Sequence, residues 1–366
     1  MRISGFRAAL IAAMAGAVAG CVPAGTSAPA PIARPAPPPR MAPPKVQPVQ
    51  VAPVVQTPQP PAGLLNAVHA LGGAFKGQVA ISVRDVERGW VVDWHGDRPQ
   101  PQQSVSKLWV AIAVMDAVDR GKLSLATPVT VRRSDLTLFH QPIRSLVGKH
   151  GHRTTVGRLL TCAMTQSDNS CNDVLLWKVG GPSAIRRMLD EKGIDGVTFG
   201  PGERELQART AGLTWRREWA GGWGFRKARA ALSYKARAKA LNRYLADPMD
   251  GASANGVTLG IDLLARGKLL RRASTASLLA TMHASRTGPL RLKSGLRPGW
   301  RLAHKTGTGQ DLGSLSTGYN DVGLLISPTG HRYAVAVMIA STRERIPTRM
   351  KLMGDVTRAI IRIAGN

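Results

Sequence analysis

The chain has 366 residues, which is enough for one large domain or two small ones. It carries 50 Lys and Arg against 22 Asp and Glu, a formal net charge of +28, while aromatic residues make up only 5%. Such a charge favours anionic surroundings, and the scarcity of aromatic side chains among the basic ones argues against a nucleic-acid-binding module. We therefore expect that the protein does not bind nucleic acid. An anionic cell-wall polymer is a possible partner, and we expect the protein to be a monomer.

The first 21 residues, MRISGFRAALIAAMAGAVAGC, contain two arginines, a short apolar run and small residues before Cys21. The run is too short for a good membrane-spanning helix, and its pattern is typical of a secretory signal peptide. The ending VAGC resembles a bacterial lipobox, which implies cleavage before Cys21 and attachment of lipid to it. An ordinary signal peptide with a chance cysteine is the alternative. We expect a periplasmic, lipid-anchored protein, with the outer membrane favoured because Val22 follows the cysteine.

Residues 22–62 contain 14 of the 25 prolines and no acidic residue. A segment of this composition cannot bury a core and favours an extended, polyproline-like chain of about 3.1 Å per residue. The sequence thus predicts a signal peptide over 1–21, a tether over 22–62 and a catalytic domain over 63–366.

Alternating apolar and polar residues in GQVAISVRDVERGWVVDW predict a hairpin of strands over 78–83 and 90–94. Near the C-terminus, WRLAHKTGTG, NDVGLLIS and RYAVAVMIAS predict three more strands, and an amphipathic helix over 350–363 follows. The block between these strands, about 104–285, is mostly helical in pattern. Together they predict an α/β fold: a five-stranded antiparallel sheet built from both chain ends, flanked by helices, with an inserted all-helical domain.

Ser104 and Lys107 begin the helical block, in the stretch SVSK. Residues three apart share one face of a helix, so the Lys107 amine is expected beside the Ser104 hydroxyl. A serine is a weak nucleophile until a base removes its proton, and a desolvated lysine can act as that base. Backbone N–H groups at the helix start could also help to hold a developing oxyanion.

A second motif, Ser167-Asp168-Asn169, lies at a break between two helical runs. In a loop, the Ser167 hydroxyl could pass a proton to a leaving nitrogen, and the Asn169 carboxamide could bind a substrate amide. The alternative is an ordinary helix cap.

Cys162 and Cys171 flank this second motif and lie nine residues apart. An exported location permits a disulfide. Because the two cysteines stand on either side of a predicted bend between helices, we expect two small buried thiols instead.

A third motif, AHKTGTG, places Lys305 and Thr306 on a glycine-rich predicted strand. They offer a cation and a hydroxyl group to a carboxylate, and the glycines would let a substrate backbone approach closely. A glycine-rich edge strand with a surface lysine is the alternative.

The three motifs in this order form the S-x-x-K, S-D-N and K-T-G set of penicillin-recognising serine enzymes. From about Gly63 onward the chain resembles a class A serine β-lactamase, also through TQSDNSCNDVLLWKVGGPSAI and TGPLRLKSGLRPGWRLAHKTGTG. The resemblance implies a β-lactamase/transpeptidase-like fold and β-lactam hydrolysis, with no metal and no cofactor. Two alternatives stay open: a penicillin-binding-protein-like D-Ala-D-Ala peptidase or envelope esterase, and a non-catalytic cell-envelope binding lipoprotein.

The resemblance also implies roles for single residues. Ser104 matches the acylated nucleophile, Lys107 its proton acceptor and Ser167 the proton shuttle, while Asn169 matches the residue that binds the acyl-amide side chain. The backbone N–H groups of Ser104 and Thr308 would form the oxyanion hole.

Lys305 and Thr306 match the residues that bind the substrate carboxylate and relay a proton. Arg291 matches a position where some members place a carboxylate-binding arginine, and a solvated arginine at a strand end is the alternative. Phe139 or His140 could form the aromatic wall of the cleft or simply contribute to packing.

The family hydrolyses its acyl-enzyme with a glutamate on an Ω-shaped loop, spaced E-x-x-L-N. Here Glu203 matches the base, Gln207 replaces the asparagine, and Gly202 stands where arginine is usual. Glu205 and Glu218 are the other candidate bases.

The segment 208–246, called the insert below, is longer than the family's loop. A competing alignment uses its AKALN stretch, which would put Ala238 at the base position and imply slow deacylation. The insert contains Trp215, Trp219 and Trp223, followed by a predicted cationic helix. We expect it to pack as a lid over the Ω-shaped loop, with a docking surface for glycan or a partner protein as the alternative.

Overall fold

The computed structural model describes residues 58–363. The predicted signal peptide, the lipobox Cys21 and all but the last five residues of the predicted tether lie outside this range. Within residues 58–363, none of the helices combines the length and the apolar character that crossing a membrane requires.

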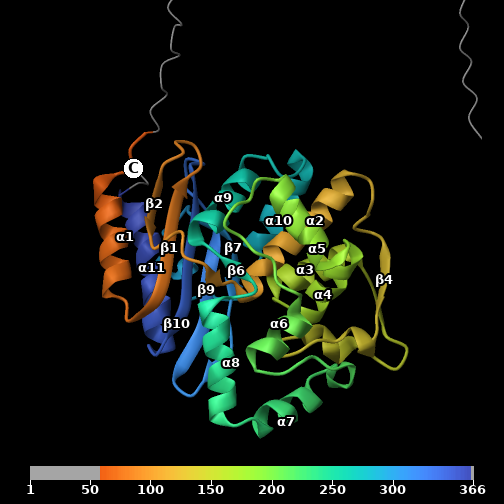
Figure 1. Ribbon diagram of the computed structural model, residues 1–366. Helices are drawn as coiled ribbons and strands as arrows, with labels where there is room; N and C mark the ends of the chain where they lie inside the picture. Colours follow the sequence, from red (N-terminus) through yellow and green to blue (C-terminus); the bar gives the residue numbers. More distant parts are fainter. Residues whose placement is uncertain (1–57, 364–366) are drawn as a thin grey trace, which may run out of the picture. The chain divides into compact units, whose positions relative to one another are not determined.

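One antiparallel sheet runs through the domain in the order β2-β1-β10-β9-β7, and a short strand, β8, pairs with β9 (Figure 1). The prediction of a five-stranded sheet built from both chain ends is confirmed, with β8 as an addition. The strands are β1 (Gly77–Asp85), β2 (Val91–Trp94), β7 (Arg301–Gly307), β8 (Asp311–Leu312), β9 (Leu315–Ile326) and β10 (Arg332–Thr342).

Both faces of this sheet are covered, so β9 and β10 are buried along nearly their whole length. Alternate residues of β10 serve different cores. Val335 and Val337 face α1 (Ala62–Ala74) and α11 (Ile346–Ile363), whereas Ala336 and Met338 face the helical domain. This two-sided burial explains why both strands are nearly continuous apolar runs. Helix α1 was not predicted, and α11 begins four residues before the predicted helix.

The helical domain is formed by the residues that come between β2 and β7 in the sequence (Figure 1). Its central helix, α2, is buried on nearly every side, through Leu108, Trp109, Ile112 and Met115 among others. The remaining helices are α3 (Val156–Thr165), α4 (Asn169–Lys178), α5 (Gly181–Glu191), α6 (Glu203–Thr210), α7 (Trp223–Ala231), α8 (Tyr234–Ala246), α9 (Ala254–Ala265) and α10 (Arg272–His283), and α2 itself spans Lys107–Asp119.

Short elements connect these helices. The 3₁₀ helix η1 (Gln103–Ser106) leads directly into α2 and carries Ser104. Two small antiparallel ladders, β3 with β6 and β4 with β5, are not part of the main sheet. The other short elements are β3 (Gln100–Pro101), β4 (Pro128–Val131), β5 (His152–Thr155), β6 (Gly251–Ala252), η2 (Arg133–Asp135), η3 (Pro142–Leu146), η4 (Arg217–Trp219) and η5 (Leu292–Gly295).

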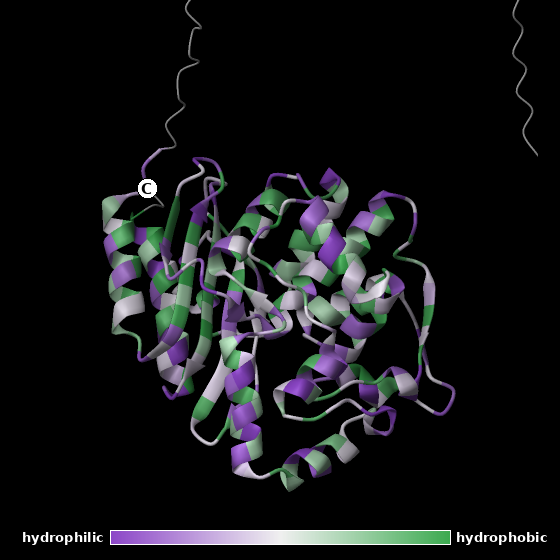
Figure 2. Ribbon diagram, viewed as in Figure 1, coloured by the Kyte–Doolittle hydropathy of each residue, from purple (hydrophilic) through white to green (hydrophobic). Residues whose placement is uncertain are grey.

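The insert forms two helices, α7 and α8, rather than the single helix predicted. Ser233 separates them, because its side chain accepts the N–H of Ala236 and caps a new helix. Trp219 and Phe225 are buried in a small core with Leu138, while Trp223 is largely exposed. Figure 2 shows many hydrophilic residues along α8, as its composition predicts.

Candidate active site

Lys107 is the centre of the site, at the first residue of α2. Its fully buried Nζ donates hydrogen bonds to Ser104 Oγ at 2.8 Å, to Asn169 Oδ1 at 2.9 Å and to Glu203 Oε1. An ammonium group has three N–H donors, and here each has an oxygen acceptor. One amine thus connects the first motif, the second motif and the predicted water-activating glutamate.

Gln103, just before Ser104, has an unfavourable backbone conformation that its hydrogen bonds stabilise. Gln103 has φ 53°, in the left-handed region, and such strain is common at active sites. Asp250 Oδ2 accepts the Gln103 N–H at 2.7 Å, and the Gln103 side-chain amide donates to the Tyr244 hydroxyl at 2.6 Å. Tyr244 in turn donates to Asp250 Oδ1 at 2.7 Å. Burial raises the pKa of Asp250 to about 6.

The three residues of the second motif, Ser167-Asp168-Asn169, make different contacts. Asp168 caps α4, because its carboxylate accepts the N–H of Cys171 at 2.9 Å. It also accepts the N–H of Ile143, in η3, at 2.7 Å. Ser167, with φ 61°, and Asn169 line the cavity on either side of it. The helix-cap interpretation is therefore right for Asp168, while its two neighbours face the cleft.

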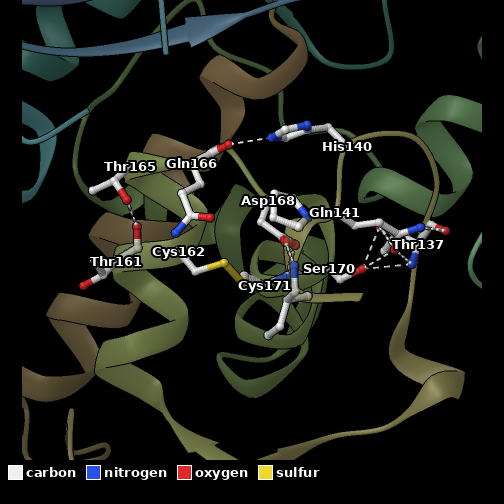
Figure 3. Close-up of a disulfide and its surroundings, with 12 residues drawn as sticks. Thr137, His140, Gln141, Thr161, Cys162, Thr165, Gln166, Asp168, Ser170 and Cys171 are labelled. Carbon is white, nitrogen blue, oxygen red and sulfur yellow. Dashed lines mark hydrogen bonds between the residues drawn. A yellow bond between two sulfur atoms is a disulfide. The ribbon is translucent and has the colours of Figure 1, made fainter. Parts of the chain in front are cut away.

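The expectation of two free thiols was wrong: Cys162 and Cys171 form a disulfide, with their Cα atoms 6.2 Å apart (Figure 3). Cys162 lies on α3 and Cys171 in the first turn of α4. Because the bend at the second motif folds α4 back against α3, it brings the cysteines together instead of separating them. Figure 3 shows this disulfide beside Asp168.

Strand β7 brings the third motif to the same place. Lys305 Nζ donates to Ser167 Oγ at 2.8 Å, and the Thr306 hydroxyl contacts that of Thr287 at 2.7 Å. Burial lowers the pKa of Lys305 well below its ordinary value, and the positive charges of Lys107 and Arg291 add to this effect. Lys305 is fully buried, so the surface-lysine alternative is wrong.

Gly307 is required by a close approach within the chain. A Cβ atom at this position would overlap the backbone carbonyl of Gln102, just before η1. The glycine therefore lets β7 approach the backbone just before Ser104. That the glycines also admit a substrate backbone stays a prediction.

Arg291 is buried rather than solvated. Its guanidinium donates to the backbone oxygens of Gly307 at 3.0 Å and Asn320 at 2.6 Å, and to Thr308 Oγ1 at 2.7 Å. It also lies over the ring of Tyr319, with Cζ 3.8 Å from the ring centroid. A positive charge is thereby fixed behind the end of β7.

Glu203 is the first residue of α6 and is only 3% exposed. Besides Lys107, its carboxylate contacts Gln207 Nε2 at 3.2 Å. Neither of the other candidate acids makes such contacts: Glu205 pairs with Arg209, and Glu218 is 65% exposed.

The structure does not support the competing alignment, which puts Ala238 at the position of the base. Ala238 lies on α8 and packs with Leu206, Leu241 and Tyr244 in a small apolar core. The structure thus brings Glu203, and not Ala238, against Lys107.

Asp173 is a site residue that the sequence analysis missed. Its buried carboxylate accepts the N–H of Glu203 at 3.0 Å and that of Arg204 at 3.4 Å, so it caps α6 from outside. Burial raises its pKa to about 6, and the nearby Glu203 charge contributes. The spacing offered a signal, because residues four apart, such as Asn169 and Asp173, share one face of a helix.

A cavity of about 670 Å³ opens over these groups. Both aromatic candidates line it. Phe139, with φ 59°, packs edge to face on Phe225, and His140 contacts the Gln166 carbonyl at 2.8 Å. The cavity lining includes Ser104, Ser167, Asn169, Gln207, Arg229, Thr287, Gly288, Arg291, Thr306, Thr308 and Gln310.

A buried lysine against a serine hydroxyl, a second serine against a second lysine, and a carboxylate within reach are the parts of a serine acyl-transfer enzyme. The fold and the site therefore define a serine hydrolase.

Comparison with known proteins gives the family. Residues 63–364 match the model of the β-lactamase enzyme family. The chain therefore belongs to this family, and its fold is that of the class A serine β-lactamases.

Individual relatives agree. The extended-spectrum β-lactamase PER-1 of Pseudomonas aeruginosa is 28% identical over 70% of this chain and 72% of its own length. β-Lactamase VEB-1 of the same organism is 24% identical over 70% of this chain and 76% of its own length. The solved structure of a β-lactamase from Chitinophaga pinensis superimposes with a TM-score of 0.68 at 26% identity, covering 83% of this chain and 99% of that one.

Proposed function

We propose that this chain hydrolyses β-lactams through an acyl-enzyme on Ser104, with Glu203 as the base of the hydrolytic step. The observation that carries the proposal is the position of Lys107, which contacts the Ser104 hydroxyl and the Glu203 carboxylate at once. A proton can therefore move between nucleophile, lysine and glutamate without rearrangement of the site.

In the acylation step, Lys107 passes a proton to Glu203 and accepts that of Ser104, whose Oγ attacks the lactam carbonyl carbon. The N–H groups of Ser104 and Thr308 receive the developing oxyanion. As the carbon–nitrogen bond breaks, the Ser167 hydroxyl donates a proton to the leaving nitrogen. The proton taken from Ser104 then restores Ser167, and Glu203 returns its proton to Lys107, so that its carboxylate is ionised again before the hydrolytic step.

The substrate carboxylate is assigned to the third motif. Lys305 and Thr306 provide a cation and a hydroxyl on β7, and Arg291 adds its charge from behind Thr308. Asn169 is assigned to the acyl-amide group of the substrate, because its side chain lines the cavity beside Ser104. These groups place the lactam carbonyl over Ser104.

In the deacylation step, a water molecule gives a proton to Glu203 and its oxygen attacks the acyl carbon. The bond to Ser104 Oγ breaks, and the proton returns to Ser104 through Lys107. Gln207 supplies a carboxamide beside Glu203 in place of the family's asparagine.

The test compares Glu203→Gln with Glu205→Gln in the chain lacking residues 1–21, using a chromogenic cephalosporin. Removing a general base typically costs 10²–10⁴-fold, so Glu203→Gln should lose roughly a thousandfold in turnover, while Glu205→Gln, a surface change on the same helix, should keep it. Equal turnover in both variants would overturn the assignment of the base. Labelling of Ser104 without turnover in the unaltered chain would instead favour the peptidase alternative.

We further propose that the protein is exported and anchored at Cys21 in the outer membrane. The lipobox-like VAGC and the proline-rich segment 22–62 support this location, and so does the disulfide, because disulfides persist mainly in oxidising compartments. Growth with labelled palmitate should label the protein, and Cys21→Ser should abolish the label and release the protein into the soluble periplasmic fraction. An unlabelled, soluble unaltered protein would contradict the proposal.

A further inference from the structure

Arg229 is a cationic side chain in the cleft that belongs to none of the three motifs. It comes from α7, within the insert, and lines the same cavity as Ser104 and Asn169. The question is what a basic residue of the insert contributes to this cavity.

The position of Arg229 is fixed by the packing of α7. Phe225, which lies four residues earlier on the same face, is buried between Trp219 and Phe139, with ring centroids 5.8 Å and 5.5 Å away. The Arg229 guanidinium then lies over the ring of Phe139, with Cζ 5.9 Å from the centroid. Its Nη2 donates to the backbone oxygen of Asp311 at 3.2 Å.

Arg229 thereby bridges the cleft. Phe139 belongs to the loop between η2 and η3 of the helical domain, and Asp311 begins β8 at the edge of the sheet. The other cationic groups of the cleft make other contacts: Lys305 of the third motif bonds to Ser167, and Arg291 bonds to Thr308. The cavity therefore has positive charge at two places held by different parts of the chain.

The hydrogen-bonding capacity of Arg229 is not used up. Within residues 58–363, its Nε is buried and has no hydrogen-bond partner, and no carboxylate forms an ion pair with the guanidinium. The Asp311 carboxylate, which attracts Arg229 at longer range, accepts the Ser316 hydroxyl at 2.5 Å. Burial lowers the pKa of Arg229, and the charge of Arg237 adds to this, whereas the negative charge of Asp311 raises it. A bound anion would raise the pKa of Arg229 in the same way.

We propose that Arg229 binds a second negative charge, carried on the acyl side chain of the substrate, so that the cleft favours dianionic β-lactams. This inference rests on the proposed function, in which Lys305 and Thr306 bind the carboxylate that all penicillins share. A charge-assisted hydrogen bond from a guanidinium to a carboxylate is among the stronger polar contacts, and the planar guanidinium offers several N–H donors to a carboxylate's two oxygens.

The test uses two penicillins that differ by one carboxylate: benzylpenicillin and its α-carboxy derivative, carbenicillin. For the full mature chain, the rate constants for acylation of Ser104 and the kcat/KM values are measured with both substrates. The readout is the ratio of carbenicillin to benzylpenicillin, which does not depend on the fraction of folded enzyme. Arg226→Gln is the matched control, because it removes the same charge from an exposed position of the same helix.

We expect Arg229→Gln to lower the ratio about tenfold and Arg226→Gln to leave it unchanged. The proposal is overturned if Arg229→Gln keeps the ratio, or if Arg226→Gln lowers it as much, since the effect would then come from net charge alone. If neither penicillin acylates the unaltered chain, the proposed function fails, and the inference fails with it.

Discussion

The hydroxyl of Tyr244, on α8 of the insert, is expected to stabilise the backbone at Gln103, just before Ser104. It donates to Asp250 at 2.7 Å and accepts from the Gln103 amide at 2.6 Å. A hydrogen bond to a charged group contributes about 1.5–3 kcal/mol, so Tyr244→Phe should lower the free energy of unfolding by about 2 kcal/mol. For a large domain this corresponds to a Tm lower by roughly 4 °C. Tyr234→Phe is the control, since Tyr234 is 66% exposed on the same helix.

The cost of Tyr244→Phe should depend on pH. Burial raises the pKa of Asp250 to about 6 in the folded protein, above the ordinary value of about 4. A carboxyl group with a raised folded-state pKa destabilises the fold above that pKa, and the penalty disappears as the pH falls from about 6 to about 4. Removing the donor raises the pKa of Asp250 further, so the variant should lose more stability at pH 7.5 than at pH 5.

Thermal and urea unfolding of the unaltered chain, Tyr244→Phe and Tyr234→Phe at both pH values measures this effect. A variant as stable as the unaltered chain at pH 7.5, or a loss larger at pH 5, would refute the reasoning. Because the same hydroxyl supports the Gln103 side chain next to Ser104, the rate of acylation should also fall in Tyr244→Phe and not in the control.

Three further predictions concern Asp173, Gly307 and the disulfide. Asp173→Asn should raise stability at pH 7.5 by on the order of 2 kcal/mol, because the raised pKa of Asp173, about 6, means that its buried charge destabilises the fold above that pH; an unchanged or lower urea midpoint would contradict this. Gly307→Ala should greatly slow acylation, since the new Cβ displaces η1 through Gln102, whereas Gly148→Ala, where a Cβ meets open space, should keep the rate. Replacing both cysteines of the disulfide by alanine should lower stability by about 2–3 kcal/mol; a loss below about 0.5 kcal/mol in urea unfolding would argue against a structural role.

The sheet and the three motifs could be predicted because their signals are local. Period-two patterning defines β1 and β2, the apolar runs define β9 and β10, and short spacings place Ser104 next to Lys107. The order of the motifs in a sheet–helix–sheet frame then indicated that they meet in one cleft. The structure brings Lys107, Asn169 and Glu203 into contact, as that hypothesis requires.

What could not be predicted depends on packing between distant segments. The pairing of Cys162 with Cys171 follows from the angle between α3 and α4, which no spacing reveals. Likewise, the reason for Gly307 lies in the approach of Gln102, some two hundred residues away in the sequence. The contribution of Arg229 to the cavity depends on where the core around Phe225 places α7, and the insert has no periodic signal that gives this position.

The central claim is that Ser104 forms a covalent intermediate that Glu203 then releases. The most direct measurement is acid-quenched intact-protein and peptide mass spectrometry after mixing benzylpenicillin with Glu203→Gln and with Ser104→Ala. The account predicts one intact penicillin bound at Ser104 in Glu203→Gln and none in Ser104→Ala. An adduct on another residue, or an adduct that persists after Ser104 is removed, would contradict it.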